Sequence, residues 1–352
     1  MKQKKYIVIG VMSGTSLDGI DLAVLEITVV PRFSYTFGTT TTVPYSAFWK
    51  ERLQQAIQFS SKELEKLNED YTYYLAQQIN DFIRRAAIEK VDAICSHGHT
   101  VLHQPEAGIT LQIGNLPILA GLMQQKVVCD FRVQDVQLGG QGAPLVPIGD
   151  ELFFREYDYC LNLGGFANCS YENNQKQRIA YDICPVNIVL NSYAQLLGEA
   201  YDAEGAFAKA GTVNREVLKQ LNALSFYSQF PPKSLGLEWV QECVLPILEA
   251  AQLPPKAILA TFTEHVAMQL TKQFVDNTRI LVTGGGAYNT FLLERVRHYT
   301  KAQLHVPDQQ LIEFKEALIF GLLGVLRLED QINCLSSVTG AQRDHCSGTI
   351  YS

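Results

Sequence analysis

Short apolar runs alternate with amphipathic stretches along the chain, beginning with an apolar run over residues 6–9 and one rich in β-branched residues over 20–29. A glycine- and serine-rich segment separates these runs, which predicts a strand, a turn and a second strand. Ser60 and Glu63 have the spacing of a helix capping box. Helically spaced apolar residues follow, so we expect a long amphipathic helix over about residues 61–90.

Two further apolar runs, at residues 91–96 and 126–131, have the character of buried parallel strands. A helix is expected between them, near residues 117–125. The first part of the chain is therefore predicted to be an α/β lobe.

A similar pattern restarts near residue 157, where apolar runs flank the dipeptide Gly164-Gly165. Three helically spaced stretches and a strand that runs into three glycines follow, at residues 186–197, 213–224, 255–274 and 279–283. We therefore expect two α/β lobes related by duplication, residues 1–130 and 131–352, with the last helix packing back on the first lobe.

Composition narrows the possible partners and the compartment. The net charge is −7 and no basic run follows the first five residues, which argues against a nucleic-acid partner. Eight scattered cysteines without a C-x-x-C pair indicate reduced thiols rather than a disulfide framework or a zinc site. The first apolar run is too short for a secretory signal, and no later run is long enough to span a bilayer. We expect a cytoplasmic protein without a membrane partner.

The turn between the first two strands has the chemistry of a phosphate cradle, with Ser13, Gly14, Thr15, Ser16, Asp18 and Gly19. Glycines let the backbone approach an anion, hydroxyls and amides donate to phosphate oxygens, and the Asp18 carboxylate can hold magnesium directly or through water. An ordinary hairpin turn would also explain Asp18-Gly19. The segment is not a Walker A loop, because no Gly-Lys-Ser/Thr sequence is present.

Two other glycine turns occupy comparable positions. Gly164-Gly165 begins the second lobe, and Gly284-Gly285-Gly286 follows a strand, as expected where backbone lies against a nucleotide. A tight strand-to-helix turn is the plainer interpretation of the glycine triplet. The G-x-G-x-x-G fingerprint is absent, which argues against a dinucleotide-dependent oxidoreductase.

Several polar residues are candidates for substrate contacts. Strand alternation would place His97 and His99 on one side, but no Asp, Glu or Cys lies nearby at ligand spacing, so a sugar-binding strand end is favoured over a metal site. Arg132 precedes a glycine-rich connection and could meet an anionic group or form a surface ion pair. Asp182 follows apolar residues just before a predicted helix, which suits a general base or a helix N-cap.

These segments, in this order, resemble those of the anhydro-N-acetylmuramic acid kinase family of the actin-like sugar kinase superfamily. The resemblance covers nearly the whole chain and is strongest at Gly10-Val11-Met12-Ser13-Gly14-Thr15-Ser16-Leu17-Asp18-Gly19 and at Leu138-Gly139-Gly140-Gln141-Gly142-Ala143-Pro144. It implies two actin-like (ribonuclease H-like) lobes with a central ATP/substrate cleft.

The resemblance also implies an ATP- and Mg²⁺-dependent kinase that converts 1,6-anhydro-N-acetylmuramic acid and water to N-acetylmuramic acid 6-phosphate in peptidoglycan recycling, and it implies a homodimer. Asp182 matches the family's base. The ATP-binding positions would be Gly14, Thr15, Ser16, Leu17, Asp18, Gly19, Ile20, Asp21, Gly164, Gly165, Gly284, Gly285 and Gly286. The amino-sugar contacts would come from His97, Gln112 and Arg132.

The segment after Asp182 departs from the family pattern, and single positions differ as well: His99 replaces a usual glutamine, Asn115 a usual acidic residue and Leu237 an expected arginine. Where the family usually has Asp-Thr-Gly-Pro-Gly-Asn, this chain has Asp182-Ile183-Cys184-Pro185-Val186-Asn187. The altered segment keeps two alternatives open, a kinase of another amino or anhydro sugar and a catalytically inactive ATP-binding regulator.

Overall fold

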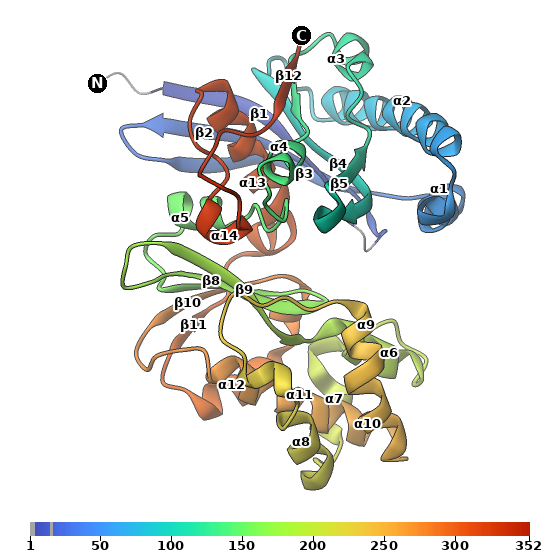
Figure 1. The fold of residues 1–352 in the computed structure, drawn as a ribbon, viewed down its shortest axis with the longest axis vertical. Coiled ribbons are helices and arrows are strands. Elements are labelled where there is room, and N and C mark those ends of the chain that lie inside the picture. Colours follow the sequence, from blue (N-terminus) through green and yellow to red (C-terminus); the bar gives the residue numbers. More distant parts are fainter. Residues whose placement is uncertain (1–3, 15–16) are drawn as a thin grey trace. The chain divides into compact units, whose positions relative to one another are not determined.

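The computed structural model describes residues 4–14 and 17–352, and the chain divides into two compact units (Figure 1). One unit consists of Met1–Phe153 together with Phe314–Ser352, and the other of Phe154–Glu313. The sequence placed the boundary after residue 130 and assigned residues 131–352 to one lobe, so these bounds differ. Residues 314–352 belong to the first unit because the C-terminal strand extends its sheet and the last long helix packs against it.

The sheet of the first unit has the order β12-β6-β4-β1-β2-β3, and β5 pairs with β4. Neighbouring strands are antiparallel from β1 to β3 and parallel from β1 through β4 to β6. All four apolar runs predicted for this part of the chain form strands, but β3 and β5 were not predicted. The strands are β1 (Lys4–Ser13), β2 (Gly19–Val30), β3 (Ser34–Pro44), β4 (Ala93–Gln104), β5 (Ile109–Ile113), β6 (Val127–Cys129) and β12 (Thr349–Tyr351).

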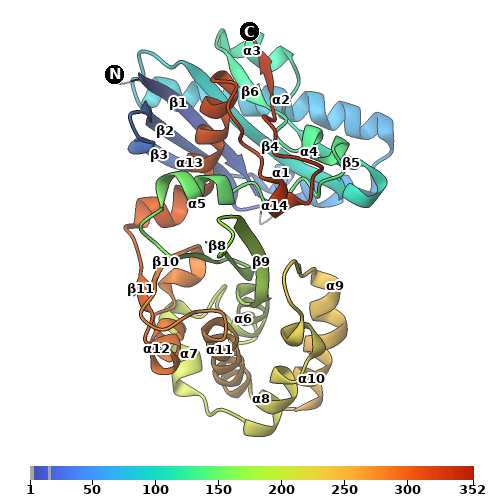
Figure 2. The same cartoon turned by 60° about the vertical axis from the view of Figure 1, so that its left-hand side comes forward.

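Helices cover both faces of this sheet (Figures 1 and 2). On one face α2 (Ser61–Arg85) begins with the predicted capping box and contributes to the core shared with β1 and β2. On the other face α13 (Gln309–Leu328) packs so closely that a Cβ on Gly10 would lie 2.0 Å from the Ala317 carbonyl oxygen. The remaining helices are α1 (Ala47–Gln55), α3 (Ile118–Met123), α4 (Val133–Gln137), α5 (Pro147–Phe153) and α14 (Ser336–Thr339).

The sheet of the second unit has the order β11-β10-β7-β8-β9, antiparallel from β7 to β9 and parallel from β7 through β10 to β11. Its strands are β7 (Tyr159–Leu163), β8 (Phe166–Glu172), β9 (Arg178–Pro185), β10 (Arg279–Thr283) and β11 (Gln303–His305). Its helices are α6 (Asn187–Gln195), α7 (Ala206–Ala210), α8 (Arg215–Asn222), α9 (Leu237–Trp239), α10 (Leu245–Ala250), α11 (Pro255–Thr271) and α12 (Thr290–Tyr299).

The two sheets repeat one topology. In each, three antiparallel strands in sequence are followed by two strands that add in parallel beside the first, which gives β3-β2-β1-β4-β6 in one unit and β9-β8-β7-β10-β11 in the other. The similarity that the sequence indicated between the two lobe beginnings therefore extends through five strands of each sheet.

All eight cysteines are free thiols. Among the described helices, none is both long and apolar enough to cross a membrane.

Candidate active site

The first glycine turn joins β1 to β2. The Leu17 N–H donates to the Gly14 carbonyl at 3.3 Å, and Leu17 has a left-handed backbone with φ 59°. Asp18 is exposed, whereas the Ile20 side chain is buried in the core, so only the backbone of Ile20 can reach a ligand. The Asp21 carboxylate accepts a hydrogen bond from Thr42. Thr15 and Ser16, which the sequence assigns to ATP binding, lie outside the described residues.

His97 and His99 lie on opposite faces of β4, so the prediction that they share a side is wrong. Gly98, with φ 74°, interrupts the alternation, and the register between β1 and β4 shifts at this point. The His99 Nδ1 lies 2.8 Å from the Ser13 hydroxyl on the face covered by α2, while the His97 ring lies 4.6 Å from that of Phe320 in α13.

His97 and Arg132 form a direct contact. The Arg132 Nε donates to the His97 Nε2 at 2.8 Å, and its Nη1 donates to the Gly142 carbonyl at 2.6 Å. Because Nε2 accepts, the proton of the neutral imidazole is on Nδ1, which lies 2.9 Å from the Gly98 carbonyl. Burial and the Arg132 charge hold the pKa of His97 well below its usual value. His97 is therefore a neutral hydrogen-bonding group rather than an acid.

Gln112 lies on the same sheet face as His97. It pairs with Thr100 across β4 and β5, and its Nε2 donates to the Thr110 hydroxyl at 2.9 Å. Its buried Oε1 has no hydrogen-bond partner among the described residues. An orphaned buried acceptor is costly unless a ligand donates to it. The three residues predicted to bind the sugar thus share one face of the first unit, and the Gln112 Oε1 has no hydrogen-bond partner among the described residues.

In the second unit the glycine triplet packs against the end of β7, directly before Gly164-Gly165. A Cβ on Gly284 would be 2.5 Å from the Asn162 Oδ1, and one on Gly286 would be 2.7 Å from the Leu163 Cβ. Gly284 also has φ 80°, which an L side chain rarely adopts. The carbonyls of Gly164 and Gly165 accept hydrogen bonds from the first amides of α6. Gly284 and Gly286 are therefore required by close packing against β7.

A row of polar side chains crosses this sheet. Asn162 of β7 is directly opposite Asn168 of β8, which is opposite Asp182 of β9. Directly opposed residues point to the same face, and the adjacent residues Leu161 and Leu163 lie in the hydrophobic core. The two asparagines are not among the site residues predicted from the sequence, although polar residues at these positions interrupt otherwise apolar strands.

Asp182 is half-buried within β9 and is not at its end. Its Oδ2 accepts a hydrogen bond from the Leu235 N–H at 2.8 Å, and its own N–H donates to the Lys233 carbonyl. Burial raises the pKa of Asp182, and the Leu235 hydrogen bond opposes part of that rise. The side chain does not cap α6, whose N-cap residue is Val186.

The residues that depart from the family pattern after Asp182 belong to the hydrophobic core. Ile183, Cys184 and Val186 are almost fully buried there. Val186 has φ −132°, which is outside the left-handed region that favours glycine. The Asn187 side chain donates to the Leu163 carbonyl and so links α6 to β7. The departures therefore alter packing behind the polar row and leave its face unchanged.

Two units with the same five-strand topology, each beginning with a glycine turn between antiparallel strands, define an actin-like kinase fold, and the chain is a sugar kinase. The sequence profile described as anhydro-N-acetylmuramic acid kinase matches residues 6–352. The chain belongs to the anhydro-N-acetylmuramic acid kinase family.

Individual relatives agree with this assignment. An anhydro-N-acetylmuramic acid kinase of Saccharophagus degradans is 33% identical, with 99% of each chain covered. One of Gloeobacter violaceus is 35% identical over 97% of this chain and 98% of the relative. One solved structure shows a more distant likeness. An activator of the 2-hydroxyisocaproyl-CoA dehydratase from Clostridium difficile is 12% identical with a TM-score of 0.43, covering 90% of this chain and 94% of that one.

Proposed function

We propose that this chain uses ATP, Mg²⁺ and water to convert 1,6-anhydro-N-acetylmuramic acid to N-acetylmuramic acid 6-phosphate in peptidoglycan recycling. The observation that carries the proposal is the family match over residues 6–352 together with the retained Asp182, whose carboxylate lies half-buried in a polar row. A reducing cytoplasmic location fits eight free thiols. A homodimer is part of the same proposal.

In the proposed reaction Asp182 acts as the general base. It takes a proton from water as the water oxygen bonds to C1 of the sugar, and the C1–O6 bond breaks with its electron pair going to O6. O6 bonds to the γ-phosphorus, and the bond from phosphorus to the bridging oxygen breaks to release ADP. A pKa raised by burial makes the Asp182 carboxylate a stronger proton acceptor than an exposed aspartate.

The nucleotide is assigned to the glycine turns, with Gly14 to Asp21 in the first unit and Gly164, Gly165 and Gly284 to Gly286 in the second. The glycines among these positions have no Cβ that would hold a phosphate or an adenosine away. The exposed Asp18 carboxylate suits a magnesium ion, directly or through water. When bound, magnesium would neutralise charge on the phosphates.

The sugar is assigned to His97, Gln112 and Arg132. The unpartnered Gln112 Oε1 would accept a hydrogen bond from a sugar hydroxyl or amide group. Two of the five Arg132 N–H groups donate to His97 and Gly142, and the others suit the lactyl carboxylate.

The test compares two sugars in the presence of Mg²⁺ and ATP, 1,6-anhydro-N-acetylmuramic acid and 1,6-anhydro-N-acetylglucosamine, which lacks the lactyl group. We expect ADP and sugar phosphate in equal amounts from the first sugar and a much lower kcat/KM for the second. Faster turnover of the second sugar would favour a kinase of another substrate. ATP binding without turnover of either sugar would favour the inactive regulator.

A further inference from the structure

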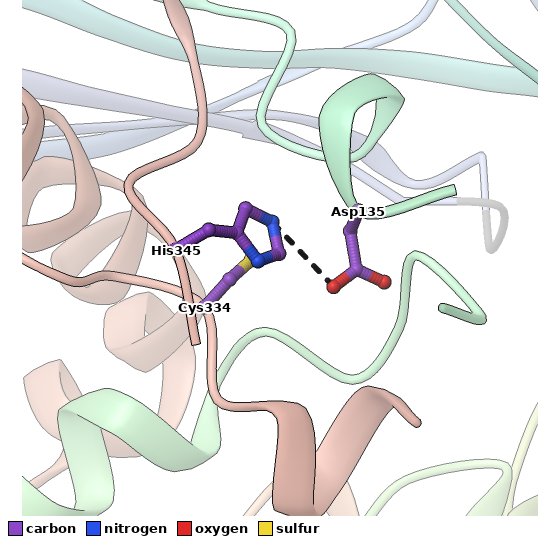
Figure 3. Close-up of side chains that lie close together, drawn as sticks. All are labelled: Asp135, Cys334 and His345. Carbon is purple, nitrogen blue, oxygen red and sulfur yellow. Dashed lines mark ion pairs between the residues drawn. The ribbon is translucent and has the colours of Figure 1, made fainter. Parts of the chain in front are cut away.

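Three buried side chains from distant parts of the sequence meet in the first unit (Figure 3). Asp135 comes from α4, and Cys334 and His345 come from the segment after α13; they are 0%, 2% and 6% exposed. Their potential ligand atoms all lie within 4.8 Å of one another. Within residues 4–14 and 17–352 this is the one group of three such side chains.

The backbone holds the three residues in place. Cys334 and His345 are directly opposed in an antiparallel bridge, with each N–H donating to the other's carbonyl. The Asp135 Oδ2 accepts from the Gly142 N–H and its Oδ1 from the Thr339 hydroxyl, each at 2.7 Å. The side chain of Asp135 and the backbones of Cys334 and His345 are therefore held in place by hydrogen bonds.

One ring nitrogen of His345, Nε2, has no hydrogen-bond partner among the described residues. Nδ1 lies 3.1 Å from the Arg343 carbonyl oxygen, which can only accept, so Nδ1 carries a proton. Nε2 is buried and has no hydrogen-bond partner among the described residues. It lies 3.6 Å from the Asp135 Oδ1, as the dashed line in Figure 3 shows. In the neutral ring, the lone pair of Nε2 thus faces the Asp135 Oδ1. Because both atoms are electron-rich, a cation between them would stabilise this arrangement.

The separation matches a shared metal ion better than a hydrogen bond. An N–H···O hydrogen bond spans about 2.9 Å. Nitrogen and oxygen ligands at about 2.1 Å from a tetrahedral zinc ion are about 3.4 Å apart. The Cys334 sulfur adds a soft ligand, which favours zinc over magnesium or calcium. We propose that Asp135, Cys334 and His345 bind a zinc ion whose fourth ligand is water.

The surrounding contacts have the pattern of an outer shell around a metal. A ligating histidine ordinarily donates its other N–H to a carbonyl or carboxylate, as Nδ1 of His345 does to Arg343, and the Thr339 hydroxyl orients the Asp135 carboxylate. Sequence spacing could not reveal this site, because its ligands come from segments that only the fold brings together.

The ion would hold the C-terminal segment against α4, next to the candidate sugar site. Gly142 is the shared point, since its N–H donates to Asp135 and its carbonyl accepts from Arg132. The zinc site is structural and does not depend on the proposed reaction. The competing interpretation is a protonated His345 paired with Asp135 and no metal.

The test uses the full-length protein after a chelator has removed its bound metal. Its zinc affinity is then measured by competition with a chromophoric chelator. We expect one equivalent of zinc to bind, and Cys334→Ser or His345→Gln to weaken binding by about 100-fold or more. Cys346→Ser, which changes the neighbouring cysteine outside the cluster, is the matched control and should bind zinc as the wild type does. Thr339→Val should weaken binding by roughly 10–100-fold through the loss of an outer-shell hydrogen bond.

A second measurement uses only the wild-type chain and so does not depend on how the variants fold. Cobalt(II) in place of zinc should give the near-ultraviolet absorption of a thiolate-to-cobalt charge transfer, which zinc abolishes by displacement. A cobalt complex without that absorption would overturn the proposal. So would equal zinc affinity of the wild type, Cys334→Ser and His345→Gln, which would leave the cluster as an imidazolium–carboxylate pair.

Discussion

Asp130, two residues before Arg132, offers a test of how burial changes the pKa of a single carboxylate. Burial raises the pKa of Asp130 from 3.8 to about 6, and a hydrogen bond from Asn115 opposes part of the rise. Its backbone is left-handed, with φ 58°, a conformation that asparagine also tolerates. Asp130→Asn therefore removes the charge with little change of shape or backbone preference.

The magnitude follows from linkage. Between pH 3.8 and about 6 the folded state binds more protons at Asp130 than the unfolded state, so this group lowers stability as the pH rises. At about 1.4 kcal/mol per pKa unit, the full cost is about 3 kcal/mol. The cost is about 1 kcal/mol near pH 4.5 and about 3 kcal/mol near pH 8. The nearby Cys129 thiol and Tyr351 phenol stay neutral over this range, because burial raises the pKa of each.

The two tryptophans make the assay specific to one unit, since Trp49 lies in the first unit and Trp239 in the second. In a Trp239→Phe background, urea unfolding followed by Trp49 fluorescence should show that Asp130→Asn raises the free energy of unfolding by about 2 kcal/mol more near pH 8 than near pH 4.5. An equal gain at both pH values, or a loss near pH 8, would refute the reasoning.

Three further predictions test the candidate site. Asp182→Asn should lower kcat by about 100- to 10,000-fold, while the ATP affinity measured by calorimetry is retained. The kcat/KM of the wild type should rise with pH through the raised pKa of Asp182. Near-normal turnover in the variant would remove Asp182 from the mechanism. Gly286→Ala would place a Cβ 2.7 Å from a β7 side chain, so it should lower the free energy of unfolding in urea by about 1–3 kcal/mol and weaken ATP binding. Gly165→Ala, whose Cβ would lie 3.9 Å from its nearest neighbour, should leave the free energy of unfolding nearly unchanged. Equal losses in the two variants would contradict the packing argument. Arg132→Met should lower the free energy of unfolding by about 1–3 kcal/mol for each buried acceptor that it leaves without a donor. It should also raise the pKa of His97, measured by NMR titration. An unchanged His97 pKa would show that the Arg132 charge does not act on this histidine.

Much of the fold could be predicted because the interior strands are continuous apolar runs and α2 has a capping box and a helical apolar face. The edge strand β3 was missed because its side chains are mostly exposed and include a run of threonines, without the apolar pattern of a buried strand. The pairing of β12 with β6, which joins the C-terminal strand to the first unit, could not be predicted because it is a contact between segments far apart in the sequence.

The geometry of the candidate site also depends on features that residue type and spacing do not determine. The sequence selected Asp182 and the glycine turns by residue type, but the bulge at Gly98 that separates His97 from His99 depends on a single backbone conformation. The alignment of Asn162 and Asn168 with Asp182 depends on strand register, which pairing across the sheet sets. The cluster of Asp135 with the C-terminal residues requires the tertiary structure.

The most direct test of the central claim is mass spectrometry of the product formed from 1,6-anhydro-N-acetylmuramic acid, Mg²⁺ and ATP in ¹⁸O-labelled water. Attack of water at C1 predicts a sugar 6-phosphate that carries one ¹⁸O on the sugar and none on the phosphate. Labelled inorganic phosphate with an unchanged anhydro sugar would show that the protein only hydrolyses ATP, and it would contradict the account.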